Sequence, residues 1–493
     1  MNALSALGLA FFSGLLLGGA YPTVGLGFFA YAGIIPLFTI IRQCSTGRVL
    51  LWSWISGLIF YSLTIYWIHR ITWIGMILML PVLAFFYALP FAAARIVYQR
   101  YPRLGFAVLP FAVAGFEWIR SFDALAFPWM ILGNSQTAYP FFVQFADITS
   151  VFGVSAWVVF VNISMYLLVR KRTVRRWLFF AVLFIAPTAY SLIVMYSFSP
   201  SGKKLTVALI QGNVEPDQKW EGDMEAWNVN LYCTMSIEAM AHKPDLIVWP
   251  ETATPVYLLQ TPIYRRMVQS LVDSIDVPLL TGMPSIDLDT GRTWNAAGFF
   301  VPEGRTVQEY RKIHLVPFGE AIPLDNIFPS LRKIDFGQAN WDEGTESVVF
   351  TSDSVPSFGT VICFESIFPD FVRRFVKKGS EFIVVITNDV WFGPRPAPQQ
   401  HAMISVFRAI EFHRPIVRCA NTGISMIIDQ YGRILKQTGT FERTTLIGTI
   451  TPERRQTFYG RFGNLFSMAS FLVTITCMGF SLYKKNHSGE ENQ

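Results

Sequence analysis

GTVICFESIFPD, residues 359 to 370, places one cysteine and one glutamate directly after a short run of glycine and β-branched residues. Apolar runs of this length, bounded by turn residues, are typical of strands that are buried on both faces of a sheet. The overlapping PDFVRRFVKKG, residues 369 to 379, carries apolar residues at helical spacing. The stretch therefore predicts a buried strand over GTVICFE, residues 359 to 365, with Cys363 at its end, and a helix that follows.

Further apolar runs of the same kind occur in the middle of the chain. They are LTVALIQ (205 to 211), DLIVWP (245 to 250) and EFIVVITND (381 to 389). A helical pattern, residues 224 to 241, lies between the first two of these runs. Because strands alternate with helices, we expect a layered α/β domain in this part of the chain.

The composition departs from that of a soluble domain. Of the 493 residues, 52% are hydrophobic and only 15% are charged, against about 25% charged in ordinary soluble domains. The net charge is +6, but the tightest basic cluster, residues 170 to 176, lies between two apolar segments. This arrangement is typical of a cytoplasmic loop beside a membrane. We therefore expect a membrane protein that contacts lipid and does not bind nucleic acid.

About eight apolar segments approach the roughly 20 residues that a helix needs to cross a bilayer. They are residues 3 to 20, 25 to 41, 50 to 68, 75 to 97, 104 to 119, 151 to 169, 177 to 197 and 462 to 483. The first lacks a positively charged start and is followed at once by further spans, so we expect a helix rather than a cleaved signal peptide.

Basic residues are concentrated in alternate loops, which predicts that both chain ends are cytoplasmic. Residues 1–199 would form a transmembrane region of about seven helices. Residues 200–455 would form a catalytic domain on the far side, and residues 456–493 a last transmembrane helix and a cytoplasmic tail. In a bacterium with two membranes, this places a multi-pass protein in the inner membrane with its catalytic domain in the periplasm.

Three reactive side chains follow predicted strands or turns: Glu251, Lys312 and Cys363. A thiol of ordinary pKa, about 8.5, needs a base before it acts as a nucleophile at neutral pH. Glu251 could be that base, Lys312 could stabilise an oxyanion, and the backbone N–H of Phe364 could complete the oxyanion hole. Each residue also has a structural alternative: a core cysteine, a turn glutamate and a solvated lysine.

The five cysteines have no CxxC spacing and no metal-ligand spacing with the six histidines. The chemistry of the three reactive residues requires no metal. We therefore expect neither a metal nor another cofactor.

Three motifs around the reactive residues resemble the Glu-Lys-Cys signature of the carbon-nitrogen hydrolase, or nitrilase, superfamily. They are WPET at Glu251, YRKIHLVPFGE at Lys312 and ICFE at Cys363. Other motifs are similar to one branch, the apolipoprotein N-acyltransferases. These are QGNVEPDQKW (211 to 220), TNDVWFG (387 to 393), QQH (399 to 401) and RAIEFHRPIVRCANTG (408 to 423). The resemblance covers nearly the whole chain and implies a nitrilase-like α-β-β-α sandwich beside a multi-span α-helical membrane region.

The resemblance also implies roles for individual residues. Cys363 would be the nucleophile, Glu251 the general base and Lys312 the oxyanion stabiliser. Four further residues match supporting or substrate-binding positions of the family: Glu320, which would help to hold the lysine, Glu365, Trp220 and Phe364. Relatives often carry tyrosine at the position of Phe364, so this chain lacks a hydroxyl there.

The implied reaction is an acyl transfer. Cys363 would take a fatty acyl chain from a membrane phospholipid, commonly phosphatidylethanolamine, and pass it to the N-terminal amine of a diacylated lipoprotein. A membrane-anchored amidase with the same three residues is the alternative, although one anchor would suffice for it. A transporter would carry ionisable residues inside its spans, and these spans are nearly free of them.

Two smaller features have competing interpretations. EAIPLDNIFPSLRKIDF, residues 320 to 336, could be a lid that contacts lipid or a loop packed on the α/β core. Glu117, near the fifth apolar segment, could pair with Arg120 or contact a lipid head group.

Overall fold

The computed structural model describes residues 1–21, 26–122, 126–197, 202–215, 224–317, 319–321 and 341–490. The chain divides into two compact units. One consists of residues 1–69, 73–197 and 462–493, and the other of residues 70–72 and 198–461. The first unit is helical, and the strands of the described chain belong to the second.

The helical unit has helices at all eight predicted spans. They are α1 (Ala3–Gly19), α2 (Ala30–Gly33), α3 (Ile35–Gln43), α4 (Thr46–Thr64), α5 (Trp73–Arg100), α6 (Pro102–Ile119), α7 (Ala146–Arg170), α8 (Val174–Ser197) and α15 (Leu465–Glu490). Among the described residues, only α5, α7, α8 and α15 are long and apolar enough to cross a membrane. The second predicted span is divided between α2 and α3, so eight crossings stay a prediction.

Short 3-10 turns connect several of these helices. They are η1 (Gly27–Phe29), η2 (Tyr66–Arg70), η3 (Pro128–Met130), η4 (Leu132–Gln136) and η5 (Pro140–Phe142). The last three follow one another between α6 and α7.

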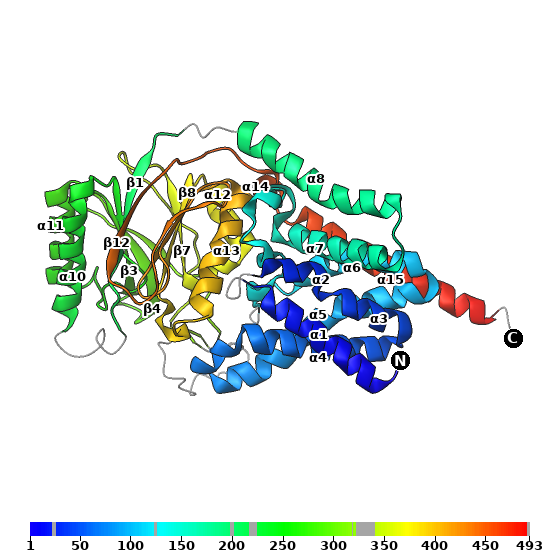
Figure 1. Ribbon diagram of the computed structural model, residues 1–493. Helices are drawn as coiled ribbons and strands as arrows, with labels where there is room; N and C mark the ends of the chain where they lie inside the picture. The colour runs from blue at the N-terminus through cyan, green and yellow to red at the C-terminus, as the bar shows by residue number, and fades with distance from the viewer. Residues whose placement is uncertain are drawn as a thin grey trace. The chain divides into compact units, whose positions relative to one another are not determined.

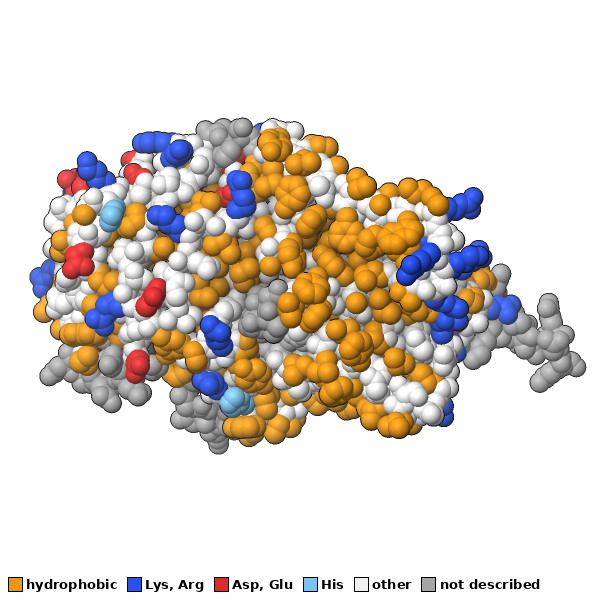
Figure 2. All heavy atoms as spheres, in the orientation of Figure 1, with side chains coloured by type: hydrophobic (Ala, Val, Ile, Leu, Met, Phe, Trp, Pro, Cys, Tyr) orange, Lys and Arg blue, Asp and Glu red, His pale blue; other side chains and the backbone are white. Residues whose placement is uncertain are grey.

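Large apolar side chains are exposed on the helical unit. Trp73 and Ile74 on α5 are 63% and 65% exposed, and Ile185 on α8 is 64% exposed. On the face shown in Figure 2, hydrophobic side chains cover most of this unit. Soluble monomers rarely expose apolar patches of this extent. The surface is therefore typical of helices that contact lipid.

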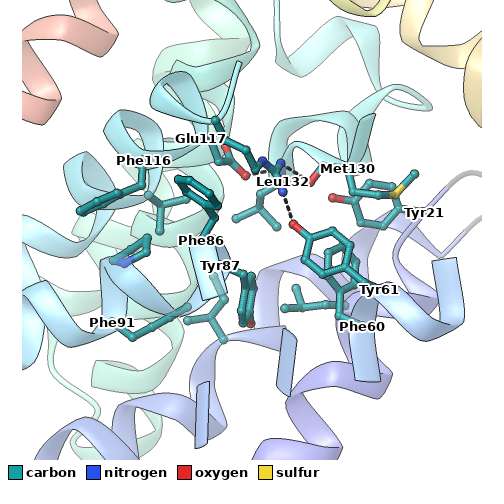
Figure 3. A pocket seen from close by; sticks show the side chains of 15 residues that line it. Tyr21, Phe60, Tyr61, Phe86, Tyr87, Phe91, Phe116, Glu117, Met130 and Leu132 are labelled. Atoms are coloured by element: carbon teal, nitrogen blue, oxygen red, sulfur yellow. Dashed lines mark hydrogen bonds between the residues drawn. The ribbon is translucent and has the colours of Figure 1, made fainter. Parts of the chain in front are cut away.

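A pocket within the helical unit is lined mainly by hydrophobic side chains, seven of them aromatic (Figure 3). Two charged residues at the end of α6 border it. Glu117 accepts a hydrogen bond of 2.7 Å from the backbone N–H of Leu132. Arg120 donates to the hydroxyl of Tyr61 and, at 3.2 Å, to the backbone carbonyl of Met130. Both charged side chains therefore have partners inside the protein, and both hold the segment that follows α6.

Within its described residues, the α/β unit contains twelve strands. They are β1 (Leu205–Gln211), β2 (Leu246–Val248), β3 (Leu279–Ile286), β4 (Thr293–Phe300), β5 (Gln308–Arg311), β6 (Val349–Phe350), β7 (Phe358–Ile362), β8 (Phe382–Thr387), β9 (Ile416–Ala420), β10 (Met426–Ile428), β11 (Ile434–Gln437) and β12 (Thr444–Ile450). They form two six-stranded sheets, in the orders β12-β1-β2-β3-β4-β5 and β11-β10-β9-β8-β7-β6. The strands β1 to β3 are parallel, as are β7 to β9.

The two sheets face each other. The ring of Phe299 on β4 lies 5.1 Å from that of Phe358 on β7, measured between centroids. The thiol of Cys419 on β9 donates to the carbonyl of Val248 on β2 at 3.3 Å. Only a sandwich of the two sheets brings these strands together.

Helices cover the outer faces of the sandwich (Figure 1). The helices α10 (Met224–Ala239) and α11 (Pro262–Ile275) share a buried core with the first sheet. The helices α12 (Pro369–Lys377) and α13 (Ala397–Phe412) pack on the second. The unit also contains α14 (Phe458–Phe462) and the turns η6 (Met240–His242), η8 (Cys363–Ile367) and η9 (Asp389–Phe392). This is the α-β-β-α sandwich that the sequence implied.

The strand predicted over residues 359 to 365 is shorter at its end in the structure. The strand β7 ends at Ile362, and Cys363 begins the turn η8. The φ of Cys363 is 52°, which lies in the left-handed region and is incompatible with a strand. The cysteine therefore projects from a sharp turn at the end of the strand.

Candidate active site

The candidate site lies where strands of both sheets end. Glu251 follows β2 of the first sheet, whereas Cys363 and Asn388 follow the parallel strands β7 and β8 of the second. The backbone N–H of Asn388 donates to Oε2 of Glu251 at 2.7 Å. The carboxyl ends of parallel strands are the usual place for ligand sites in α/β folds, and here this hydrogen bond joins the ends of the two sheets.

Lys312 directly follows β5 and is fully buried. Its Nζ lies 2.8 Å from Oε1 of Glu320 and 3.4 Å from Oε1 of Glu251. Burial alone would lower the pKa of Lys312, but the negative charges of Glu320, Glu251 and ionised Cys363 more than offset it and raise the pKa. Lys312 is therefore a cation at neutral pH, held between two carboxylates.

Glu251 is 5% exposed and has partners on both carboxylate oxygens. Besides Lys312 and Asn388, the side-chain amide of Asn295 donates to its Oε1 at 2.7 Å. Burial raises the pKa of Glu251, and the charge of Glu320 adds to this, while Lys312 opposes it. A carboxylate with a raised pKa is a stronger base than an ordinary one, which suits proton abstraction from a thiol.

Cys363 is 5% exposed. Burial raises the pKa of its thiol well above the ordinary value, and the negative charge of Glu251 raises it further, whereas Lys312 lowers it. The thiol is therefore protonated at neutral pH and becomes a nucleophile only when a base removes the proton. The structure thus brings together the three predicted residues: the base Glu251, the cation Lys312 and the thiol Cys363.

Two further predicted glutamates hold the segments that carry these groups. Glu320 accepts from Lys312 and also, at 2.9 Å, from the backbone N–H of Val316. Glu365 is fully buried and accepts from the backbone N–H of Ile362 and Ile313, both at 2.7 Å. One carboxylate therefore ties the strand before Cys363 to the residue after Lys312.

Phe364, Trp220 and the predicted lid are the remaining features that the sequence assigned to the site. Phe364 is buried, and its ring packs edge-on against Phe368 with centroids 5.2 Å apart. Trp220 lies outside the described residues. Of the predicted lid, residues 320 to 336, only Glu320 and Ala321 lie within the described chain.

Sequence reasoning missed Asn295 as a site residue. Its amide donates to Glu251 and, at 3.1 Å, to Glu320, and its backbone carbonyl accepts from the N–H of Lys312 at 2.8 Å. Asn295 is the third residue of β4, a polar side chain in a mostly apolar strand. That polar position was the one available signal.

A second group of buried polar residues lies near Cys363: Asp389, His401 and Arg418. Each belongs to a motif quoted above, but the sequence assigned none of them a role. All three are buried and lie behind Cys363. Burial raises the pKa of Asp389, but Arg418 and His401 more than offset it and lower the pKa to about 2. Burial and the charge of Arg418 lower the pKa of His401.

Cys363, Asp389 and His401 are close enough together to offer ligands to one metal ion, with their ligand atoms within 4.8 Å of one another. The guanidinium of Arg418, however, lies 2.8 Å from the carboxylate of Asp389 and 3.1 Å from a ring nitrogen of His401. A fixed positive charge at this distance repels a metal cation. The donor set therefore does not fit a metal site.

Two protein-family models match this chain. The family model of the carbon-nitrogen hydrolases matches residues 206–459, which make up almost all of the α/β unit. The model of the apolipoprotein N-acyltransferase N-terminal domain matches residues 13–164. The α/β unit is thus that of a carbon-nitrogen hydrolase.

Two curated relatives narrow the class to a family. The apolipoprotein N-acyltransferase of Geobacter metallireducens is 32% identical over 94% of this chain and 92% of its own. The protein of the same name from Chlorobaculum tepidum is 34% identical over 92% of both. This chain belongs to the apolipoprotein N-acyltransferase family, whose members are enzymes of the carbon-nitrogen hydrolase superfamily.

Among solved structures, Nit3 of Saccharomyces cerevisiae, a member of branch 10 of the nitrilase superfamily, is similar to part of the chain. It is 20% identical, with a TM-score of 0.39, over 51% of this chain and 92% of its own.

Proposed function

We propose that this protein N-acylates lipoproteins through a thioester on Cys363. Membership of the apolipoprotein N-acyltransferase family supports the reaction class. The observation that carries the mechanism is the position of Lys312, whose Nζ lies 2.8 Å from Glu320 and 3.4 Å from Glu251. Burial raises the pKa of the Cys363 thiol, and the charge of Lys312 opposes this rise. A base and a cation beside a buried thiol support nucleophilic acyl transfer.

In the first half-reaction, Glu251 takes the proton of the Cys363 thiol. The thiolate attacks the ester carbonyl of a phospholipid, for which phosphatidylethanolamine is the proposed donor. Lys312 and the N–H of Phe364 stabilise the oxyanion of the tetrahedral intermediate. The new S–C bond remains when the C–O bond breaks, and Glu251 returns its proton to the departing lysophospholipid oxygen.

In the second half-reaction, the N-terminal amine of a diacylated lipoprotein attacks the thioester. An N–C bond forms and the S–C bond breaks, so the fatty acyl chain passes to the amine. Glu251 accepts a proton from the amine, and the thiolate of Cys363 regains one. The same carboxyl group therefore acts as base and acid in turn.

We also propose a membrane arrangement for these substrates. Residues 1–199 and 456–493 would supply about eight membrane-spanning helices, with residues 200–455 on the periplasmic side of the bacterial inner membrane. The four long apolar helices support several crossings, and the basic cluster between α7 and α8 supports a cytoplasmic position for that loop. Acyl chains cost about 0.8 kcal/mol per CH₂ to move into water, so a membrane-bound enzyme suits both substrates.

The amidase alternative is not favoured. It shares Glu251, Lys312 and Cys363, so these residues do not distinguish it. The relatives that match more than nine-tenths of this chain are acyltransferases by name, and their similarity includes the helical unit that an amidase does not require.

The test is intact-protein mass spectrometry of the detergent-purified chain after incubation with phosphatidylethanolamine. We expect an added mass of one fatty acyl group that disappears when a diacylated lipopeptide is supplied. Cys363→Ala should show no adduct. Cys233→Ala, which removes another buried thiol of the same unit, should retain it. Hydrolysis of small amides without any adduct or lysophospholipid would contradict the proposal and favour the amidase.

A further inference from the structure

The residues behind Cys363 form a connected polar network. Asp389 begins η9, His401 lies on α13 and Arg418 lies on β9, and all three are 0% exposed. Nη2 of Arg418 donates to Oδ2 of Asp389 at 2.8 Å. Nδ1 of His401 lies 2.9 Å from Oδ1 of Asp389 and 3.1 Å from Nη2 of Arg418. With the ring proton on Nε2, Nδ1 accepts from Nη2 of Arg418, and the carboxylate of Asp389 holds that guanidinium in place.

The other edge of the ring faces the nucleophile. Nε2 of His401 lies 3.1 Å from the carbonyl oxygen of Cys363. We assign the ring proton to Nε2, because a carbonyl oxygen can only accept, and Nε2 also lies 3.0 Å from the hydroxyl oxygen of Ser366. The hydroxyl of Ser366 donates to the same oxygen at 2.8 Å. Two side chains therefore hold one backbone carbonyl.

That carbonyl belongs to the same peptide unit as the N–H of Phe364. The bond is trans, and in a planar trans peptide the C=O and the N–H point in opposite directions. A hydrogen bond that fixes the carbonyl of Cys363 therefore fixes the direction of the Phe364 N–H as well. It also polarises this N–H, because hydrogen bonds along one peptide unit strengthen each other.

The peptide needs such support because of its conformation. Cys363 has a φ of 52°, and residues other than glycine in the left-handed region carry a strain of about 1 kcal/mol or more unless their surroundings hold them. Glu365 fixes the N–H of Ile362 before the strained residue, and His401 fixes the carbonyl after it. The turn is thus held from both sides.

We infer that His401, held by Arg418 and through it by Asp389, is a positioning residue that aims the backbone N–H of Phe364 at the substrate oxyanion. The inference rests on the proposed function, because an oxyanion forms only in the acyl-transfer steps. It assigns a task to three residues outside the Glu-Lys-Cys set. None of the three touches substrate in this assignment, and they act through the peptide between Cys363 and Phe364.

The test compares two reactions of the same thiol in His401→Phe. Thioester formation from phosphatidylethanolamine passes through an oxyanion, whereas alkylation by iodoacetamide needs the thiolate but no oxyanion hole. Losing one oxyanion-hole donor costs about 10²- to 10³-fold, so a misaimed donor should slow thioester formation by about 10- to 100-fold. The rate of alkylation should stay within about threefold of the wild-type rate. Such a small change would show that the ionised fraction of Cys363 is largely unaltered.

Further variants distinguish a role of His401 in orienting the peptide from a general loss of structure. His401→Gln keeps a side-chain N–H and should recover part of the thioester rate. Asp389→Asn should slow thioester formation selectively, and it provides the comparison if His401→Phe does not fold. His413→Asn removes another buried imidazole from the end of α13 and is the matched control.

The outcomes are distinct. Selective loss of thioester formation in His401→Phe, with partial recovery in His401→Gln, would support the inference. A wild-type thioester rate in His401→Phe, or an equal loss of both reactions, would overturn it while leaving the proposed function intact. If the wild-type protein forms no thioester at all, the proposed function fails and the inference fails with it.

Discussion

The carboxylate of Glu365 accepts a hydrogen bond of 2.7 Å from the backbone N–H of Ile313, which lies 52 residues earlier in the chain. Because Ile313 follows Lys312 and Glu365 follows the Cys363 turn, this contact sets the spacing between the proposed oxyanion stabiliser and the proposed nucleophile. The hydroxyl of Tyr310 donates to the same oxygen at 2.7 Å. The activity should therefore depend on this carboxylate even though it takes no part in the bond changes.

Glu365→Gln tests this dependence. The amide keeps one acceptor oxygen, and its NH₂ group faces backbone donors that now lack a partner. We expect the free energy of unfolding to fall by about 1–3 kcal/mol, the range for a buried hydrogen-bonding group left without a partner. Displacement of the turn should slow thioester formation by about 10²-fold. Glu238→Gln, on the exposed side of α10, is the control, and equal rates in the two variants would contradict the expectation.

The stability of the protein should depend on the protonation of Glu365. Burial raises the pKa of this carboxyl from 4.5 to about 7, although its hydrogen-bond donors oppose the shift. The folded protein binds this proton more tightly than the unfolded chain, so the resulting stability is present below pH 4.5 and is lost as the pH rises through about 7. Asp389, with its lowered pKa, changes stability only in more acidic solution.

Melting temperatures in detergent measure this effect. Between about pH 5 and about pH 8, the wild-type protein should lose more stability than Glu365→Gln, because the glutamine does not titrate. Parallel pH profiles for the two proteins would show that Glu365 does not carry the raised pKa.

Replacement of Lys312 should affect both the thiol and the oxyanion. Lys312→Met removes the charge that opposes the burial-driven rise in the pKa of the Cys363 thiol and leaves Glu251 and Glu320 without their shared cation. We expect thioester formation to fall by about 10²- to 10³-fold. In contrast to His401→Phe, iodoacetamide alkylation at neutral pH should also slow. Lys377→Met, an exposed lysine of α12, should change neither rate.

Arg120 should stabilise the helical unit. Its guanidinium donates to the hydroxyl of Tyr61 and to the carbonyl of Met130 beside the aromatic pocket (Figure 3). Arg120→Met removes both hydrogen bonds, and the expected loss is about 2–4 kcal/mol from buried acceptors left without a donor. Thermal unfolding in detergent measures it. Arg103→Met, at the exposed start of α6, should leave the melting temperature unchanged.

Cysteine labelling tests the proposed sidedness. Thr290 lies in an exposed turn of the α/β unit, and Arg172 lies in the exposed loop between α7 and α8. In intact spheroplasts, a membrane-impermeant maleimide should label Thr290→Cys but should reach Arg172→Cys only after lysis. The native cysteines give little background, because four are buried and Cys477 lies on the apolar helix α15. The reverse labelling pattern would contradict a periplasmic catalytic domain.

Local patterns in the sequence predicted much of this protein. The strand β1 coincides with the predicted run 205 to 211, and β8 lies within the predicted run 381 to 389, because continuous β-branched runs occur almost only in buried strands. Apolar length located the helices for a similar reason, since the spacing of side chains along one segment is a local property. The motifs around Glu251, Lys312 and Cys363 indicated the family, which the comparisons confirm.

Only the tertiary structure decided which groups meet. The hydrogen bond from Asn388 to Glu251 joins residues 137 positions apart, and no local pattern pairs an asparagine after one strand with a glutamate after another. The raised pKa values of Glu251 and Cys363 likewise arise from burial and from charges on distant segments. The same holds for the network of Asp389, His401 and Arg418 behind the nucleophile. Side-chain chemistry is local to the chain, but desolvation and hydrogen-bond geometry depend on the packing of the two sheets.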